Sequence, residues 1–281
     1  MLMLKPRKTC IASQAEAMTV LTDAARRSLE EAAARAWPPR ETLERDGWTL
    51  RFSSGGSQRA NSVQSLYWFG SDAEAAIDAA EADYRARGQL PIFQIVDISV
   101  PADLDTRLET RGYARRDTTL LMTKTIAPLS SPVLTGEVPG AAGGWGQTAH
   151  AVARYPTATP DWLAIYLSVV TPDRRATAPG IIGALPEPKA FFVANLNGAP
   201  AACGLGVAEP PYCGVECMAT LAAARGQGGA RAVMHDLEAW AAEQGATTIW
   251  LQVLEANAPA RRLYDGLGYQ TAGRYWYRHA P

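Results

Sequence analysis

The clearest pattern of apolar and polar positions lies in the second half of the chain, between residues 214 and 245. Residues 214–221 are mostly apolar, as is typical of a strand, and three glycines follow within four positions. A helix is predicted from about Gly229, because apolar residues recur there with the 3.6-residue period of one helix face, at Ala230, Val233, Met234, Leu237 and Ala241. Gly245 is the expected end of this helix. The pattern therefore predicts a strand, a tight glycine turn and a helix.

The rest of the chain alternates between the periods of strands and helices. Strands are predicted at residues 47–52, 61–69, 91–100, 118–125, 189–196, 201–207, 247–254 and 275–278. Helices are predicted at residues 13–37, 72–87, 103–112, 148–154 and 161–170, and a last one carries Asn257 and ends at Gly268. Asn197-Gly198 is a turn signal that predicts a hairpin between two of the strands. The whole pattern indicates an α/β protein.

The order of elements in the first half repeats in the second half. Both halves end as strand, helix, Gly-Tyr and strand, and Arg111-Gly112-Tyr113 aligns with Leu267-Gly268-Tyr269 at an offset of 156 residues. Residues 126–146 are rich in proline and glycine, which is typical of a linker. We therefore expect two related domains in tandem, residues 1–125 and residues 147–281.

Composition and charge argue against several classes of function. With a net charge of −1 and 47% hydrophobic residues, the chain of 281 residues can form sizeable cores and has no field that attracts nucleic acid or an anionic membrane. The four cysteines and three histidines have no metal-ligand spacing, so no metal is expected. Residues 1–8 lack the apolar core of a signal peptide, and no apolar run reaches the roughly 18 residues of a membrane span. We expect a reduced, cytoplasmic protein that is a monomer or a homodimer.

The glycine turn is a candidate anion site. A turn that feeds a helix start directs several free N–H groups and the positive end of the helix dipole to one point, which suits a phosphate or pyrophosphate. Two familiar phosphate motifs do not fit: Gly229 is followed by Ala230 and Arg231 rather than by Lys-Ser/Thr, and a G-x-G-x-x-G pattern that starts at Gly226 fails at Arg231. The phosphate ligand is therefore neither that of a P-loop nor that of a dinucleotide fold.

The remaining motif, Arg-Gly-x-Gly-Gly-Ala after an apolar strand, resembles the acetyl-CoA pyrophosphate loop of the GNAT superfamily of N-acetyltransferases. Gly226 and Gly228 match the two glycines of that loop, whereas Ala223 stands where the family has Gln or Arg. About 30 residues later, Asn257, Ala260, Tyr264 and Gly268-Tyr269 resemble the family's Asn-x-x-Ala-x-x-x-Tyr-x-x-x-Gly-Phe signature. The two motifs lie in the family's order, and the resemblance covers roughly residues 145–281.

This resemblance implies two GNAT-like domains, each with a mixed, mostly antiparallel sheet flanked by helices, and direct transfer of an acetyl group from acetyl-CoA to a primary amine. Glu216 is the one carboxylate on its strand, and the resemblance implies that it stands where the family has its general base. It is expected on the strand face opposite Cys213, Val215 and Cys217. Tyr264 is expected to protonate the leaving thiolate. The positions implied in coenzyme binding are Met218, Thr220, Arg225, Gly226, Gln227, Gly228, Gly229, Ala230 and Asn257, with the Met218 amide also as oxyanion donor.

Each role has a structural alternative. Glu216 is alternatively an exposed or ion-paired side chain, Tyr264 a residue that only packs or bonds the coenzyme sulfur, and Asn257 a helix N-cap. For the whole protein, the alternatives are a non-catalytic acyl-CoA-binding or regulatory module and a transferase of a longer acyl group. The sequence does not identify the acceptor, whether small molecule or protein.

The first half lacks the chemical residues of the second. At the same offset, Leu108 stands at the position of Tyr264 and Pro101 at that of Asn257, and no glycine turn precedes the helix at residues 72–87. We therefore expect this half to bind no coenzyme and to be structural. An alternative is that it shapes the acceptor pocket, for which the candidates are Trp48, Arg51, Arg59, Asn61 and Ser62.

Overall fold

The computed structural model describes residues 21–53, 56–127 and 151–281. The strands are β1 (Glu41–Arg45), β2 (Trp48–Phe52), β3 (Val63–Gln64), β4 (Ile92–Val96), β5 (Ala114–Thr125), β6 (Ala151–Tyr155), β7 (Lys189–Leu196), β8 (Ala199–Glu209), β9 (Tyr212–Thr220), β10 (Thr248–Leu254) and β11 (Gln270–His279). The helices are α1 (Asp23–Arg35), α2 (Ala73–Ala86), α3 (Leu104–Thr110), α4 (Pro160–Val169), α5 (Pro172–Gly183), α6 (Gly229–Glu243) and α7 (Ala258–Asp265), with short 3-10 turns at η1 (Gln58–Ala60) and η2 (Ala222–Ala224).

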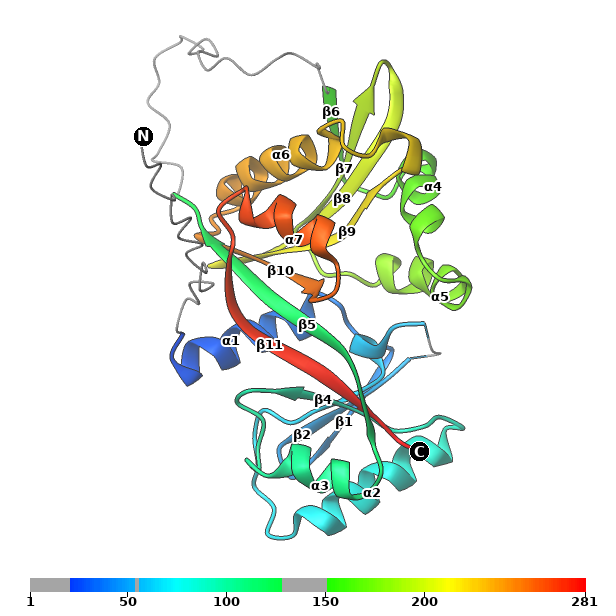
Figure 1. Ribbon diagram of the computed structural model, residues 1–281, viewed down its shortest axis with the longest axis vertical. Helices are drawn as coiled ribbons and strands as arrows, with labels where there is room; N and C mark the ends of the chain where they lie inside the picture. Colours follow the sequence, from blue (N-terminus) through cyan, green and yellow to red (C-terminus); the bar gives the residue numbers. More distant parts are fainter. Residues whose placement is uncertain (1–20, 54–55, 128–150) are drawn as a thin grey trace, which may run out of the picture.

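The eleven described strands form one continuous sheet in the order β1-β2-β3-β4-β11-β5-β10-β9-β8-β7-β6. Only the β3–β4 and β9–β10 pairs are parallel; the others are antiparallel. The expected α/β class with a mostly antiparallel sheet is confirmed. The sheet order does not follow the chain at its centre, where two long strands run side by side between the upper and lower parts of the molecule (Figure 1).

These central strands are exchanged between the two halves of the sequence. The C-terminal strand β11 lies between β4 and β5 of the first half, and β5 lies between β11 and β10 of the second half. Each half therefore completes the sheet of the other, and the division into residues 1–125 and 147–281 describes the sequence repeat rather than separate sheets. Most of the predicted linker, residues 128–146, lies outside the described residues.

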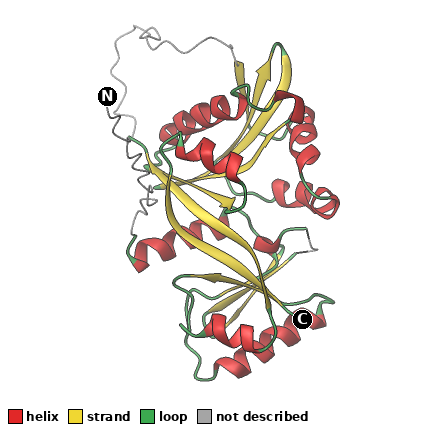
Figure 2. Ribbon diagram, in the orientation of Figure 1, coloured by secondary structure: helices red, strands yellow, loops and turns green. Residues whose placement is uncertain are grey.

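Helices cover both faces of the sheet in the second half (Figure 2). On one face, α6 and α7 bury Val233, Met234, Leu237 and Tyr264 against the strands. On the other face, α1, α4 and α5 bury a second apolar cluster that includes Trp37, Trp162 and Trp250. In the first half, α2 and α3 cover the strands and bury Ile77, Tyr84 and Leu108 among others. No helix of the described residues is long and apolar enough to span a membrane.

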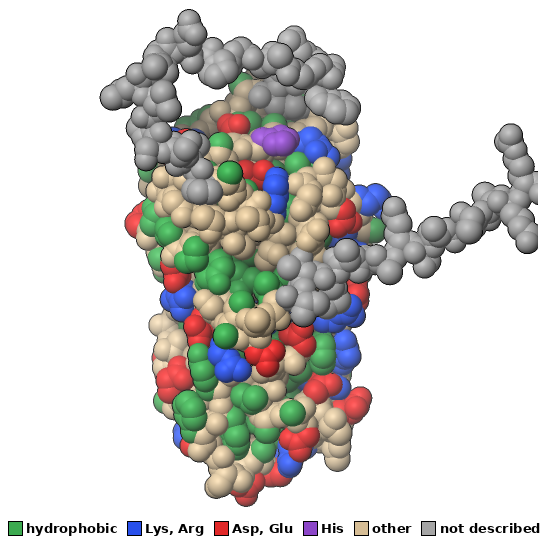
Figure 3. Space-filling model, turned by 90° about the vertical axis from the view of Figure 1, so that its left-hand side faces the viewer, with side chains coloured by type: hydrophobic (Ala, Val, Ile, Leu, Met, Phe, Trp, Pro, Cys, Tyr) green, Lys and Arg blue, Asp and Glu red, His purple; other side chains and the backbone are tan. Residues whose placement is uncertain are grey.

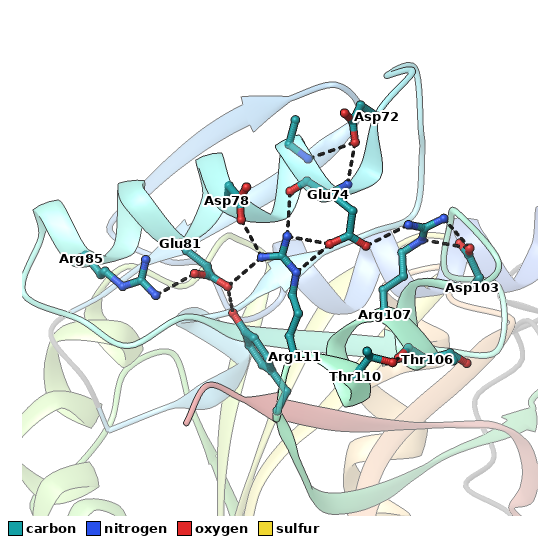
Figure 4. A network of polar contacts seen from close by, with 12 residues as sticks. Asp72, Glu74, Asp78, Glu81, Arg85, Asp103, Thr106, Arg107, Thr110 and Arg111 are labelled. Atoms are coloured by element: carbon teal, nitrogen blue, oxygen red, sulfur yellow. Dashed lines mark hydrogen bonds and ion pairs between the residues drawn. The ribbon is translucent and has the colours of Figure 1, made fainter.

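Arg111 joins α2 to α3 in the first half. Its guanidinium contacts Glu74 at 2.6 Å and Asp78 at 2.6 Å, and Arg107 binds Glu74 from the neighbouring turn (Figure 4). These ion pairs join α2 and α3 to each other. Acidic and basic side chains are also interspersed over the face seen in Figure 3, without a large area of one sign on that face.

Several predicted elements differ from the structure. Residues 151–155 form strand β6 rather than the helix predicted at 148–154, because they pair with β7 at the sheet edge and this pairing overrides their alanine content. Residues 148–150 lie outside the described residues. Helix α5 and strand β1 are not predicted by the sequence pattern, and the strand predicted at 61–69 is reduced to Val63–Gln64. Helix α5 contains Pro179 in its interior, and because proline is unfavourable there the sequence does not indicate a helix.

Candidate active site

Strands β9 and β10 part at the centre of the second half. Their parallel pairing runs from Thr248 and Tyr212 to Leu251 and Val215 and ends there. The next residues along the two strands are Glu216 and Gln252, and both line a cavity of about 770 Å³. The cavity therefore lies within the sheet, at the point where these two parallel strands separate.

A β-bulge in β9 causes this parting. Cys217 has a left-handed backbone, with a φ of 53°, and the register against β8 shifts between Cys203 and Leu205. Two residues of β9 thus oppose the single residue Gly204, which bends the bulged strand away from its neighbour. A side chain at Gly204 would place its Cβ 2.5 Å from the Met218 sulfur, so glycine leaves room for Met218 beside the bulge.

The bulge corrects one prediction about side-chain faces. Cys213 and Val215 pack on the α6 face of the sheet, opposite Glu216, as expected. Cys217, however, packs on the other face, against the cluster of α1, α4 and α5. The expectation that Cys217 shares a face with Cys213 is wrong, because the extra residue of the bulge interrupts the two-residue alternation of the strand.

Glu216 is buried and ion-paired. Its side chain is 6% exposed, and both carboxylate oxygens accept hydrogen bonds from Arg59 of η1, each at 2.7 Å. Arg59 Nη1 also donates to Gln252 Oε1 at 2.8 Å, and its guanidinium lies 5.1 Å from the ring centre of Trp37. A residue of the first half therefore occupies the centre of the site in the second half.

The other first-half candidates have structural contacts. Arg51 donates to Ser62 at 3.0 Å and to Gln94, and Trp48 is fully buried in the core of that half. Asn61 lines the cavity, but its side chain accepts from the Ser53 amide and donates to a backbone oxygen. Of the five candidates, Arg59 is therefore the one that contacts a predicted catalytic residue.

Tyr264 of α7 also lines the cavity. It is 6% exposed, and its ring packs edge-on against Tyr269 with 6.0 Å between ring centres. Burial, and secondly the negative charge of Glu216, raise the pKa of Tyr264 to about 12. The phenol is consequently protonated at neutral pH, the state in which it can donate a proton.

The glycine turn has the geometry that an anion site requires. Gly226 and Gly228 have left-handed backbones, with φ of 76° and 91°, and Gly228 caps α6 without a side-chain hydrogen bond. The amides of Gly226, Gly228, Gly229 and Ala230 donate to no backbone oxygen of the described chain. The Arg225 amide, by contrast, already makes a long bond of 3.4 Å to the Ala222 oxygen. Four amides at the start of a helix of 15 residues thus remain to bind a ligand.

Two further predicted coenzyme contacts have defined positions. Thr220 ends β9, opposite Ala202 of β8, just before the turn. Asn257 caps α7, because its side-chain oxygen accepts from the Ala260 amide at 3.2 Å. The N-cap alternative for Asn257 is thereby confirmed, and Asn257 also lines the cavity. No group of three His, Cys, Asp or Glu side chains suited to a metal is found among the described residues.

Gln252, Tyr275 and Arg174 are polar residues of the cavity wall that are not among those predicted from the sequence. Gln252 faces Arg59, Tyr275 Oη donates to Gln252 Oε1 at 3.0 Å, and Arg174 of α5 donates to Tyr166 Oη at 3.0 Å. Gln252 could have been identified as a candidate from the sequence, because it lies on the strand that follows the helix of the glycine turn. Arg174 has no such signal, because α5 itself is not predicted.

Comparison with known proteins gives similarity over almost the whole chain. The profile of the family described as "Probable histone acetyltransferase Rv0428c C-terminal" matches residues 23–278. The "Uncharacterized N-acetyltransferase YobR" of Bacillus subtilis (strain 168) is 27% identical over 256 residues, which are 90% of this chain and 97% of that protein.

Two solved structures share the fold. A GCN5-related N-acetyltransferase from Kribbella flavida has a TM-score of 0.62 and 18% identity, over 91% of this chain and 95% of that one. A tandem GNAT protein from the clavulanic acid biosynthesis pathway has a TM-score of 0.55 and 15% identity, over 90% of this chain and 88% of that one. Both alignments span the two halves of the sheet.

Proposed function

Because the chain belongs to the family of GNAT-type acetyltransferases described by the C-terminal region of Rv0428c, we propose that it transfers an acetyl group from acetyl-CoA directly to a primary amine. One observation carries the proposal. The strand that parts from its neighbour at Glu216 is the same strand that leads into the glycine turn with its four unbonded amides. A ligand held by its phosphates at the turn can therefore extend along β9 to the cavity.

The turn supplies the binding part of the proposal. The amides of Gly226, Gly228, Gly229 and Ala230 hold the diphosphate at the start of α6, where the helix dipole adds to their attraction. Arg225 precedes these amides, Gln227 lies between the first two of them, and Met218 and Thr220 border the path along β9. These groups are neutral apart from Arg225, so affinity rests on directed N–H groups rather than on net charge.

The cavity supplies the catalytic part. The amine attacks the thioester carbon, a C–N bond forms, the C–S bond breaks, and the departing thiolate takes the proton of Tyr264. The Met218 amide is the proposed donor to the developing oxyanion. The proton that the amine must lose passes to Glu216 through water. Each Glu216 oxygen retains a second lone pair beside the one that Arg59 occupies, so it can still accept a hydrogen bond from that water, and Glu216 lines the cavity.

The test is an assay of coenzyme release with purified protein, acetyl-CoA and a mixed panel of primary amines. We expect amine-dependent release of CoA and an acetylated amine by mass spectrometry. Glu216→Gln and Tyr264→Phe should each lower kcat by about 10²-fold or more, as is usual for proton-transfer groups. Arg154→Gln, in an exposed ion pair remote from the cavity, is the control.

Three results would change the proposal. Binding of acetyl-CoA in calorimetry without turnover of any amine would favour a non-catalytic acyl-CoA-binding module. Faster turnover of longer acyl-CoAs would assign a different acyl group. Full activity in both variants would remove Glu216 and Tyr264 from their roles while leaving the transferase itself in place.

A further inference from the structure

One guanidinium of the first half bonds side chains of both strands at the point where β9 and β10 part. The parallel pairing ends at Val215 and Leu251, and the next residues along the two strands are Glu216 and Gln252. Arg59 Nη1 donates to Glu216 Oε1 at 2.7 Å and to Gln252 Oε1 at 2.8 Å, and Arg59 Nη2 donates to Glu216 Oε2 at 2.7 Å. The carboxylate is therefore held by two parallel bonds, which fix its orientation as well as its position.

The short turn that carries Arg59 is itself held by other parts of the chain. Just before η1, Trp37 Nε1 donates to Ser57 Oγ at 2.9 Å, and within the turn Gln58 Nε2 donates to Asp117 Oδ2 of β5 at 2.8 Å. The guanidinium also lies 5.1 Å from the ring centre of Trp37. Contacts within the protein thus set the position of this guanidinium, as a preorganised reaction site requires.

Stability alone does not account for the pair between Arg59 and Glu216. The two side chains are 11% and 6% exposed, and at such a site the cost of taking two charges out of water offsets most of their attraction. Both residues also line the cavity. A carboxylate in a protein interior resists ionisation unless a cation or hydrogen-bond donors stabilise its charged form. Arg59 supplies a cation and two donors, and so it favours the form of Glu216 that can accept a proton.

We propose that Arg59 is a positioning residue for the transfer reaction, which keeps Glu216 ionised and in one orientation for its role as proton acceptor. The proposal rests on the proposed acetyl transfer and adds a role for the first half of the chain. Arg59 transfers no proton itself, because a guanidinium is not deprotonated in proteins. Its effect on the reaction should therefore pass through Glu216.

The kinetics of a double variant test this dependence. Arg59→Met and Glu216→Gln should each lower kcat by about 10²-fold or more, the usual contribution of a proton-transfer group. The KM for acetyl-CoA should change little, because neither side chain belongs to the glycine turn. Arg59→Met/Glu216→Gln should be no slower than Glu216→Gln alone, whereas a loss caused by disturbed structure would multiply with that of Glu216→Gln. Each rate is divided by the folded fraction from urea unfolding, because Arg59→Met also lowers stability.

Arg59→Lys separates the charge from the geometry. Lysine keeps the positive charge but lacks the planar fork that makes two parallel bonds to one carboxylate. Its kcat should lie between those of wild type and Arg59→Met, about tenfold below wild type, the usual value of a hydrogen bond to a charged group. This variant keeps the buried pair charged, so it also serves if Arg59→Met does not fold. Arg154→Met, in an exposed ion pair outside the cavity, is the control and should keep the wild-type kcat.

The pH profile distinguishes a change at the carboxylate from a general loss of structure. A carboxylate that loses its cation is harder to ionise, so the acid limb of kcat in Arg59→Met should move to higher pH by at least about one unit. Part of the lost activity should then return as the pH rises, and Arg59→Lys should show a smaller displacement. A loss of equal size at every pH, a double variant slower than Glu216→Gln, or wild-type kcat in both Arg59 variants would each overturn the proposal.

A measurement without turnover separates this proposal from the proposed function. In protein labelled at the glutamate carboxyl groups, the ¹³C resonance of Glu216, assigned by its loss in Glu216→Gln, reports ionisation directly. Its titration midpoint should lie at least about one pH unit higher in Arg59→Met than in wild type, and it should not move in Arg154→Met. If no amine is acetylated but this difference is found, the acetyl transfer fails and the control of Glu216 by Arg59 stands. If amines are acetylated while the Arg59 variants keep the wild-type kcat and midpoint, the transfer stands and the positioning role fails.

Discussion

The buried ion pair between Arg59 and Glu216 allows a quantitative test of how the two halves of the chain depend on each other. The two side chains are 11% and 6% exposed and meet in two bonds of 2.7 Å. Removing one partner of such a pair leaves an uncompensated buried charge, which typically costs about 3–5 kcal/mol. Arg59→Met removes the charge and retains much of the apolar stem. We therefore expect the free energy of unfolding to fall by about 3 kcal/mol or more.

The pair itself is not expected to be a large net source of stability. Desolvation of both ions offsets most of their attraction, so replacing both partners together costs far less than replacing one. The double variant Arg59→Met/Glu216→Gln should thus recover most of the loss seen in Arg59→Met. The coupling between the two substitutions in a double-mutant cycle should be about 2 kcal/mol or more, within the range for residues in contact.

Arg154 and Glu243 offer a matched control. Their ion pair has the same length, 2.7 Å, but the side chains are 48% and 45% exposed. Exposed pairs contribute about 0–1 kcal/mol, so Arg154→Met should change stability by less than about 1 kcal/mol. Urea unfolding followed by tryptophan fluorescence measures each variant against the wild type. Equal effects of Arg59→Met and Arg154→Met, or strict additivity in the cycle, would refute the reasoning.

Four further predictions follow from other features. Gly228→Ala should weaken CoA binding in calorimetry and cost about 1–3 kcal/mol in unfolding, because φ is 91°, whereas Gly183→Ala, with open space at its Cβ, should do neither. Gly214→Ala should lower the melting temperature, because its Cβ would lie 2.4 Å from Trp250. Burial raises the pKa of Tyr264 to about 12, so protonation of this group stabilises the fold fully below about pH 10, and this stabilisation is lost as the pH rises toward 12. In alkaline unfolding, the free energy of unfolding of the wild type should therefore fall relative to that of Tyr264→Phe between these two pH values. A variant that lacks β5 should show no cooperative unfolding by circular dichroism, since β10 and β11 both pair with β5.

The features that the sequence predicts well depend on local interactions. The glycine turn and α6 are predicted correctly because left-handed glycines and a helical apolar face act within a few residues. The hairpin at Asn197-Gly198 is present for the same reason, with φ of 53° and 82° at the two turn residues. The strand, turn and helix around the glycines could therefore be predicted from neighbouring residues alone.

The features that escape prediction depend on contacts between distant residues. Arg59 and Glu216 are 157 residues apart in the chain, and no local pattern indicates that they meet. The bulge at Cys217 is visible only once β9 is paired with β8, and residues 151–155 become a strand only at the edge of an existing sheet. Local patterns thus identify Glu216 as a candidate but cannot show that both of its oxygens accept bonds from Arg59.

The exchange of β5 and β11 explains how a half without a coenzyme loop contributes to the site. Because β5 lies between β11 and β10, the strand that carries Gln252 is held on one side by the first half of the chain. The same strand is released from β9 beyond Leu251, where the bulge bends β9 away. Arg59 of the first half also lines the cavity and binds Glu216, so the first half contributes to the proposed site through both the sheet and a direct contact.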